Sequence, residues 1–266
     1  MSLKKIAAGF ALLIGLTGAV FALEDSVRDI APTGALRVAV AVGPAASTFW
    51  ATRDPSSGQA RGVTVELAKA AAERLHVPLQ LVEYQNSGGI AAAASKDAWD
   101  ISFMPADAER EKFVDLGPSY VVYESGYLVR AGSDIRAMAE VDRAGISVGV
   151  IEGTATSRTV AKALKNASLA AFAKPEAAAA LMGQGKLDAL AMGRDALVDL
   201  SKTLPGSRLL DGAVQSTGVV VAVPKNRAAT RDWAARFVEE AKTNGTVRRA
   251  FDSAGFETTE VAPPGR

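Results

Sequence analysis

The sequence predicts an α/β fold in which mostly parallel strands are flanked by helices. Between residues 35 and 265, short runs rich in β-branched residues alternate with segments of helical periodicity. The first strand, helix and second strand follow one another closely enough to form a βαβ unit with a right-handed crossover, and the same alternation restarts near residue 146. At 266 residues, 48% of them hydrophobic, the chain is long enough for two domains that each bury a core. Two similar halves are therefore expected.

The first half opens with a strand at residues 36–42. Apolar residues at positions 63, 67, 71 and 75 recur every four residues and predict a helix. This helix should end at His76, because Pro78 follows closely. The other elements expected here are a strand at 79–82, a helix at 90–96, a strand at 100–104, a helical turn at 108–112 and an extended run at 121–129.

The second half repeats the pattern, and its last elements are expected to pack against the first half. The elements expected are strands at 146–150, 169–172, 187–192 and 218–224, and helices at 156–164, 175–182, 195–204 and 228–244, with a short helix ending near 254. The length and amphipathicity of the helix at 228–244 suit packing against the first half. Residues 261–266 form a tail.

The N-terminus is typical of a cleavable secretory signal over residues 1–22. Lys4 and Lys5 precede an apolar stretch at 6–21, and Ala22 supplies the small residue that a signal peptidase requires. A membrane anchor is the less favoured alternative, because this stretch is shorter than the roughly 20 residues that span a bilayer. Without cysteine, the mature chain has no lipid attachment site after the signal. A soluble periplasmic protein is expected.

Charge and residue content exclude several classes of function. Cleavage removes two of the 30 basic residues and none of the 29 acidic ones, which leaves 28 against 29 and gives no reason to expect a nucleic-acid partner. The single histidine and the absence of cysteine argue against a catalytic triad and a zinc site. His76 is expected to cap its helix or lie on the surface. No strand is followed by a glycine-rich nucleotide-binding motif, so neither a cofactor nor a metal is expected.

Two groups at strand ends could bind a ligand. Thr154, Ala155 and Thr156 follow the strand at 146–150, where helix-start amides and hydroxyl groups favour an anion. The threonines could equally serve only as helix caps. Arg110 lies about six residues after the strand at 100–104, and its guanidinium could hold a carboxylate through two hydrogen bonds. A solvent-exposed ion pair with a neighbouring acid is the alternative for Arg110.

Several segments resemble a known family when they are taken together. None of them is specific alone, but their order and spacing from Gly34 to about Ala254 resemble those of the family 3 extracellular solute-binding proteins, the periplasmic receptors of ABC importers for polar amino acids and related molecules. The segments are residues 34–38, 62–68, 99–101, Arg110, 114–120, 148–150 with 153–154, 185–189 and 218–224.

This resemblance implies a type II periplasmic binding protein fold. Each of two lobes would contain a mostly parallel sheet flanked by helices, and two crossing strands would join the lobes. Lobe 1 is expected to comprise residues 32–126 and 219–262, and lobe 2 residues 127–218. A monomer that closes on a ligand and delivers it to a membrane ABC permease is implied.

The resemblance also implies roles for individual residues. Arg110 matches the arginine that grips the ligand carboxylate, and Thr154 to Thr156 match the loop of the second lobe that caps the same group. Phe49 and Trp50 lie in the loop where the family places an aromatic residue against the ligand. Core packing is the alternative for both aromatic residues, and it is the better alternative for Phe49.

Two departures from the family pattern concern the ligand. Phe103 and Pro105 stand where the family often has small hydroxyl residues, and a lining of Phe103, Trp50 and Tyr120 would suit a less polar ligand.

The family acid that receives the ligand amino group would fall at Gly193, with Asp195 displaced by two residues. An amino acid still fits if Asp195, Glu124 or Glu152 takes the ammonium group. Otherwise a carboxylate without an amino group is favoured, because an unpaired buried ammonium is expensive.

The sequence therefore predicts a binding protein, not an enzyme, that captures a small carboxylate-bearing solute such as an amino acid by hinge closure. A periplasmic dehydratase of the cyclohexadienyl type, with Glu152 as general acid, is one alternative on the same fold. A sensor partner that presents its ligand to a membrane receptor is another.

Overall fold

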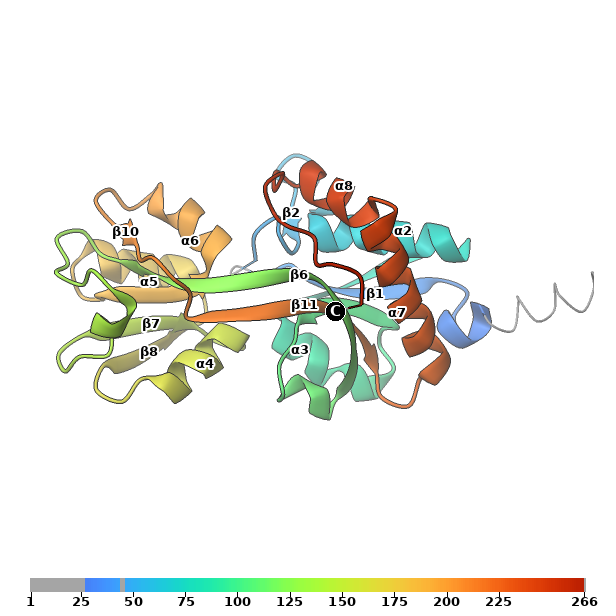
Figure 1. Cartoon of the computed structure of the whole chain (residues 1–266), viewed down its shortest axis with the longest axis horizontal. Helices are drawn as coiled ribbons and strands as arrows, with labels where there is room; N and C mark the ends of the chain where they lie inside the picture. The colour runs from blue at the N-terminus through green and yellow to red at the C-terminus, as the bar shows by residue number, and fades with distance from the viewer. Residues whose placement is uncertain (1–26, 44–45, 266) are drawn as a thin grey trace, which may run out of the picture.

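The structure, a computed structural model, describes residues 27–43 and 46–265. Two lobes of strands and helices lie at the two ends of an elongated molecule, and two long strands join them (Figure 1). The predicted signal segment, residues 1–22, lies outside the described residues. Within the part of the chain that the structure describes, no helix has both the length and the apolar character needed to cross a membrane.

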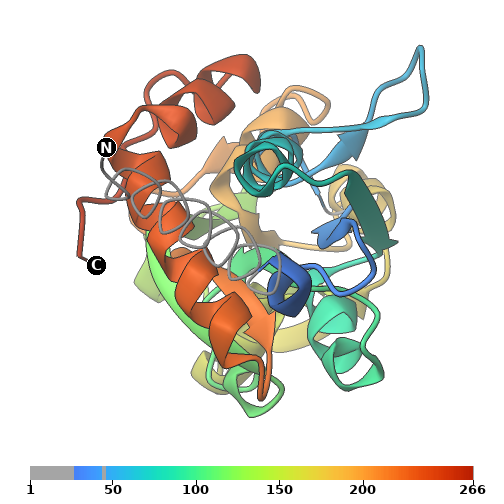
Figure 2. The same cartoon turned by 90° about the vertical axis from the view of Figure 1, so that its right-hand side faces the viewer.

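The sheet of lobe 1 is covered by helices on both faces. Its three parallel strands are β1 (Leu36–Ala41), β4 (Leu79–Tyr84) and β5 (Ile101–Pro105). One face packs on α2 (Val63–Leu75), α7 (Ala228–Thr243) and α8 (Thr246–Ser253), and Figure 2 shows α7 and α8 along one side of the lobe. The other face packs on α3 (Ser87–Ala92). Successive residues of a strand point to opposite faces, so Val38 joins the first core and Ala39 the second.

Short elements complete lobe 1. They are the hairpin of β2 (Thr52–Arg53) and β3 (Ala60–Arg61) and the 3-10 turns η1 (Ala94–Lys96) and η2 (Arg110–Lys112). His76 caps the end of α2 with a left-handed backbone, φ 56°, and is exposed, which confirms the role expected for it.

Two antiparallel strands connect the lobes: β6 (Val114–Val129) runs from lobe 1 into lobe 2, and β11 (Gln215–Pro224) runs back. In lobe 1, β11 pairs with β5, and in lobe 2 the second part of β6 pairs with β9 (Ala189–Gly193). Both lobes are therefore connected through one hydrogen-bonded ladder.

Lobe 2 repeats the arrangement of lobe 1 on a smaller scale. Its parallel strands β7 (Ser147–Ile151) and β8 (Ser168–Phe172) continue from β9, so that the described sheet has the order β4-β1-β5-β11-β6-β9-β7-β8. The short strand β10 (Arg208–Leu209) pairs with β6. Its helices are α4 (Ala155–Ala163), α5 (Pro175–Gly183), α6 (Arg194–Ser201) and the 3-10 turn η3 (Met138–Glu140). The predicted fold class is confirmed.

The expected extended run at 121–129 is only the second part of β6, which begins at Val114. Gly117 and Pro118 are unfavourable in regular strands, and they obscured the first part. In the structure Gly117 allows β11 to approach closely, since a Cβ there would lie 2.7 Å from Cγ1 of Val221. The two-residue strands β2, β3 and β10 are too short to show a periodic pattern and were not expected.

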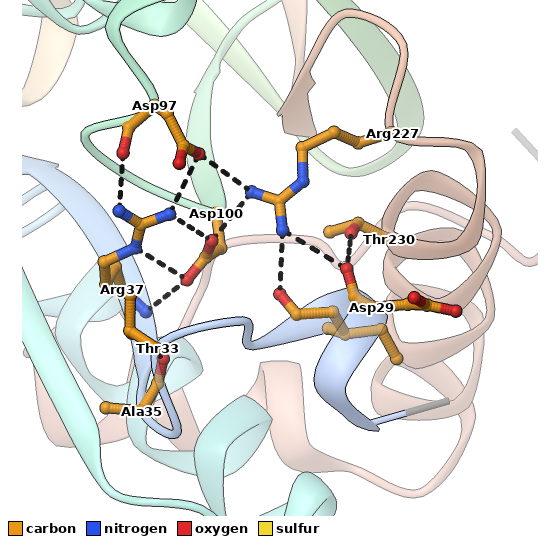
Figure 3. Close-up of polar contacts among 9 residues, drawn as sticks. Asp29, Thr33, Ala35, Arg37, Asp97, Asp100, Arg227 and Thr230 are labelled. Atoms are coloured by element: carbon orange, nitrogen blue, oxygen red, sulfur yellow. Dashed lines mark hydrogen bonds and ion pairs between the residues drawn. The ribbon is translucent and has the colours of Figure 1, made fainter. Parts of the chain in front are cut away.

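An ion cluster around the buried carboxylate of Asp100 lies at the amino ends of β1 and β5 (Figure 3). The carboxylate of Asp100, fully buried, accepts hydrogen bonds from Arg37 Nη2 at 2.8 Å and Arg227 Nη1 at 2.7 Å. Arg37 also contacts Asp97, and Arg227 reaches the carbonyl of Asp29 at 3.3 Å. The cluster ties the described N-terminal end, β1, β5 and the start of α7 together.

Candidate functional site

A cavity of about 80 Å³ lies between the two lobes. The carboxyl ends of β5, β7 and β9 meet there, which is the usual ligand position in open α/β sheets. Lobe 1 contributes Trp50, Ser87 and Pro105 to its wall. Lobe 2 and the crossing strands contribute Ile151, Thr154, Ala155, Thr156, Met192, Gly193, Tyr123, Ser125, Gln215 and Thr217.

The crossing strands supply a polar floor to the cavity. Gln215 pairs with Ser125, and Thr217 pairs with Tyr123. Residues two apart on a strand point to the same face, so all four side chains reach the cavity. Sequence analysis missed this floor, because the four residues become neighbours only through the register of β6 and β11. The short polar interruption in both otherwise apolar strands was the available signal.

Arg110 lies directly behind the cavity wall. It is 2% exposed, and its Nη1 and Nη2 donate to Pro105 O at 2.7 Å and Ser87 Oγ at 2.6 Å. Both acceptor residues line the cavity. Its Nε has no partner among the described residues. Arg110 is therefore not in the solvent-exposed ion pair that sequence analysis left open as an alternative.

Asp107, the acid whose charge acts on Arg110, does not neutralise it by direct contact. Both oxygens of Asp107 are used elsewhere, because Oδ2 accepts from Arg158 Nη2 at 2.8 Å and Oδ1 accepts from the Glu109 amide at 2.8 Å. Burial lowers the pKa of Arg110 to about 10, and the charge of Arg158 acts in the same direction, whereas Asp107 acts to raise it. The wall of the cavity thus holds a cation that lacks a bonded carboxylate.

The start of α4 faces Arg110 from the other lobe. Thr154 caps this helix, since its Oγ1 accepts from the Ser157 amide at 3.1 Å and donates to Ile151 O at 2.8 Å. Thr156 shares a hydrogen bond of 2.7 Å with Ser125. Thr154, Ala155 and Thr156 all line the cavity, so capping and cavity lining occur together. The first amides of a helix lack internal partners and favour a negative group.

The aromatic residues divide between wall and core. Trp50 lines the cavity. Phe49, 4% exposed, packs against Trp50, Phe251 and other rings instead, which is the alternative foreseen for it. Phe103 is 3% exposed and packs against Tyr120, so neither of them lines the cavity. Of the expected aromatic lining only Trp50 is found at the cavity, together with Tyr123, which the sequence analysis did not single out.

Asp195 does not reach the cavity. Its carboxylate accepts hydrogen bonds from Tyr123 Oη at 2.5 Å and from the Ser47 hydroxyl. Burial raises the pKa of Asp195, although these hydrogen bonds and those of backbone amides act to lower it. Glu124 and Glu152, the other acids considered for an ammonium group, are exposed and also lie outside the cavity wall.

Three contacts hold the lobes together around the cavity. Arg158 on α4 pairs with Asp107 of lobe 1, and Ser47 of lobe 1 bonds to Asp195 at the start of α6. Gly153 lies against the end of lobe 1, because a Cβ there would be 2.5 Å from Nδ2 of Asn86. The structure therefore describes a closed arrangement of the lobes.

Fold and site together define a two-lobed protein that encloses a cavity between its lobes. The chain belongs to the bacterial extracellular solute-binding proteins, family 3, whose family model matches residues 38–254. The search of the curated proteins gives no match.

Solved structures share the fold at low sequence identity. A mutant of the arginine-binding protein ArgBP from T. maritima has a TM-score of 0.73 and 23% identity, over 86% of this chain and 99% of that one. The ancestral amino acid-binding protein AncCDT-1, a precursor of cyclohexadienyl dehydratase, has a TM-score of 0.73 and 23% identity, over 86% and 98%. The amino acid ABC transporter protein AbpA from Streptococcus pneumoniae, bound to L-arginine, has a TM-score of 0.72 and 22% identity, over 87% and 98%.

Proposed function

We propose that this protein is a periplasmic solute-binding protein that captures a small carboxylate-bearing solute and delivers it to an ABC permease in the membrane. The observation that carries the proposal is Arg110, a buried guanidinium without a bonded carboxylate behind the wall of an interlobe cavity. A carboxylate bound there would supply the missing negative charge and could also accept hydrogen bonds from the start of α4.

Capture would occur by hinge closure of the lobes on the crossing strands. A ligand that touches both lobes stabilises the closed state in proportion to its extra contacts there. Ser87 and Pro105 would offer the ligand contacts from lobe 1, and Thr154 and Thr156 would offer them from lobe 2. The permease partner and the periplasmic location are supported by the family and by the signal segment that the sequence predicts.

The residues of the cavity wall favour binding over catalysis. A dehydratase requires a group that can donate a proton to the leaving hydroxyl. Among the described residues that line the cavity there is no Asp, Glu, His or Lys side chain, and the phenol of Tyr123 is held by Asp195. Glu152, the acid suggested by the sequence, is exposed outside the wall.

A thermal-shift screen of amino acids and simple carboxylates tests the proposal, followed by calorimetry on the best ligand. At a concentration about 100 times its Kd, a ligand stabilises the folded state by about 2.7 kcal/mol, which corresponds to a shift of roughly 5–10 °C for a protein of this size. Arg110→Ala should weaken binding by about tenfold or more, because the charged partner of the carboxylate is removed.

Arg74→Ala is the matched control. Arg74 is an exposed arginine of lobe 1 paired with Glu240 on the surface, so its removal should leave the affinity unchanged. The absence of any shift in the screen would overturn the proposal, and equal affinities for Arg110→Ala and the wild type would refute the role of Arg110.

A further inference from the structure

Tyr123 occupies the space that a side chain at position 193 would need. Gly193 ends β9 at the cavity wall. A Cβ built on it would lie 1.5 Å from Oη and 2.5 Å from Cζ of Tyr123. These distances are far below van der Waals contact, so only glycine fits at 193 while Tyr123 holds this position. The phenol of Tyr123 therefore fills the space at this edge of the cavity that a longer side chain at position 193 would otherwise occupy.

The hydroxyl of Tyr123 is fixed by Asp195. Tyr123 donates its proton to Asp195 Oδ1 at 2.5 Å, and the second oxygen of Asp195 accepts from Ser47. Tyr123 lines the cavity, whereas the carboxylate that holds it is not part of the cavity wall. The proton of Tyr123 is committed to Asp195, and the Trp50 side chain also acts on the Tyr123 oxygen as a hydrogen-bond donor. Tyr123 can therefore offer the cavity only the remaining acceptor capacity of its oxygen.

The charges around the cavity favour an anion, and among the described residues no carboxylate lines the wall that could contact a cation. Arg110 stands behind the wall, and Arg158 is balanced by Asp107. The polar side chains of the wall are neutral hydroxyl groups and one amide: Ser87, Tyr123, Ser125, Thr154, Thr156, Gln215 and Thr217. A ligand ammonium group enclosed here would lose its water without gaining contact with a carboxylate, which is costly. A hydroxyl group in the same place loses far less and can donate to Tyr123.

We propose that Tyr123, positioned by Asp195, sets the ligand class of this cavity as small carboxylates without a charged amino group, with a 2-hydroxy acid as the best match. The inference rests on the proposed function, the capture of a carboxylate, and specifies which carboxylates are taken. It differs from what the names of the structural neighbours would suggest, since those proteins bind amino acids.

Calorimetry on the wild-type protein with matched ligand pairs tests the inference. The pairs are L-lactate and L-alanine, L-malate and L-aspartate, and L-phenyllactate and L-phenylalanine, which differ only in a hydroxyl or an ammonium group. In each pair that binds, the hydroxy acid should bind about tenfold or more tightly than the amino acid. Equal or tighter binding of the amino acid overturns the inference and leaves the capture of a carboxylate intact. Binding of no carboxylate at all in the screen and the pairs overturns both.

A pair of double variants tests the position itself. Tyr123→Ala with Gly193→Asp frees the space and places a carboxylate at the wall, so the preference should shift toward the amino acids by about tenfold or more. Tyr123→Ala with Gly193→Asn has nearly the same shape without the charge and should not produce this shift.

Thermal unfolding of both double variants without ligand verifies that they are folded. If they are not folded, the single variant Tyr123→Ala is measured with the same ligand pairs. In that variant the loss of the acceptor should reduce the preference for the hydroxy acid. Identical preferences in the Asp and Asn variants, or an unchanged preference in Tyr123→Ala, would overturn the assignment.

Discussion

Two arginines of lobe 1 are similarly buried but are partnered in opposite ways. Arg37 is 9% exposed and Arg110 is 2% exposed. Arg37 donates to the carboxylate of Asp100 from Nε at 3.2 Å and from Nη2 at 2.8 Å, and it also reaches Asp97. Arg110 donates only to neutral oxygens, and its Nε has no partner among the described residues.

The difference distinguishes an arginine that stabilises the fold from the one that we propose binds a ligand. A buried charge is costly unless an opposite charge and hydrogen bonds compensate it. The hydrogen bond with Asp100 raises the pKa of Arg37, although burial opposes it, whereas burial lowers the pKa of Arg110 to about 10. At the ion cluster the chain supplies its own carboxylates, and at the cavity it does not. Whether a buried arginine has a bonded carboxylate therefore says more about its role than the extent of its burial does.

The largest expected effect is on the ion cluster. Asp100→Ala should lower the free energy of unfolding by about 3–5 kcal/mol, because it leaves the buried Arg37 and the partly buried Arg227 without their shared carboxylate. Urea denaturation followed by circular dichroism measures this loss. Asp199→Ala removes an exposed partner of Lys202 and should leave the stability almost unchanged. A loss below about 1 kcal/mol for Asp100→Ala would contradict the structural role.

An intermediate test applies the same measurement to Arg110. Arg110→Met keeps much of the volume and removes the charge. The free energy of unfolding should stay within about 1 kcal/mol of the wild type or rise, because a buried charge without a bonded carboxylate is removed together with two hydrogen bonds to neutral groups. If stability falls as far as in Asp100→Ala, Arg110 is a structural residue and the contrast between the two sites disappears.

The smallest effect is expected at the ion pair between the lobes. Arg158→Gln should weaken ligand binding by about two- to fivefold, because the pair with Asp107 links the two lobes and is partly exposed. Calorimetry at low and high salt measures it, and the difference from the wild type should shrink at high salt.

The pH dependence of this ion pair has a definite sign. Burial acts to raise the pKa of Asp107, but the hydrogen bonds from Arg158 and the Glu109 amide prevail and lower it below 3.8. The contribution of the pair to closure is therefore complete above pH 3.8 and is lost as the pH falls through the lowered value. A loss of the Arg158 contribution already between pH 5 and 7, within the usual range of protein stability measurements, would contradict this.

Local signals in the sequence were sufficient for most of the fold and for part of the site. Helical periodicity predicted α2, and the hydroxyl residue before α4 marked both a cap and a cavity residue. Arg110 could be singled out because it follows a buried strand at short distance, where strand ends and ligands meet. The sequence could not show which of Phe49 and Trp50 lines the cavity. Both are adjacent aromatic residues, and the fold of the loop decides which one faces the core and which one faces the cavity.

The sequence by itself determined the α/β alternation and the candidate arginine, because each depends on residues that are near one another in the chain. Its resemblance to the family implied that an acid is missing at Gly193. Only the tertiary structure decided what replaces that acid. Tyr123 and Ser47 reach Asp195 from 72 and 148 residues away along the chain, and only the crossing strands and the closed lobes bring these groups together. Charge compensation in a cavity depends on distance in space, and distance in space is set by the register of the sheet and the closure of the lobes.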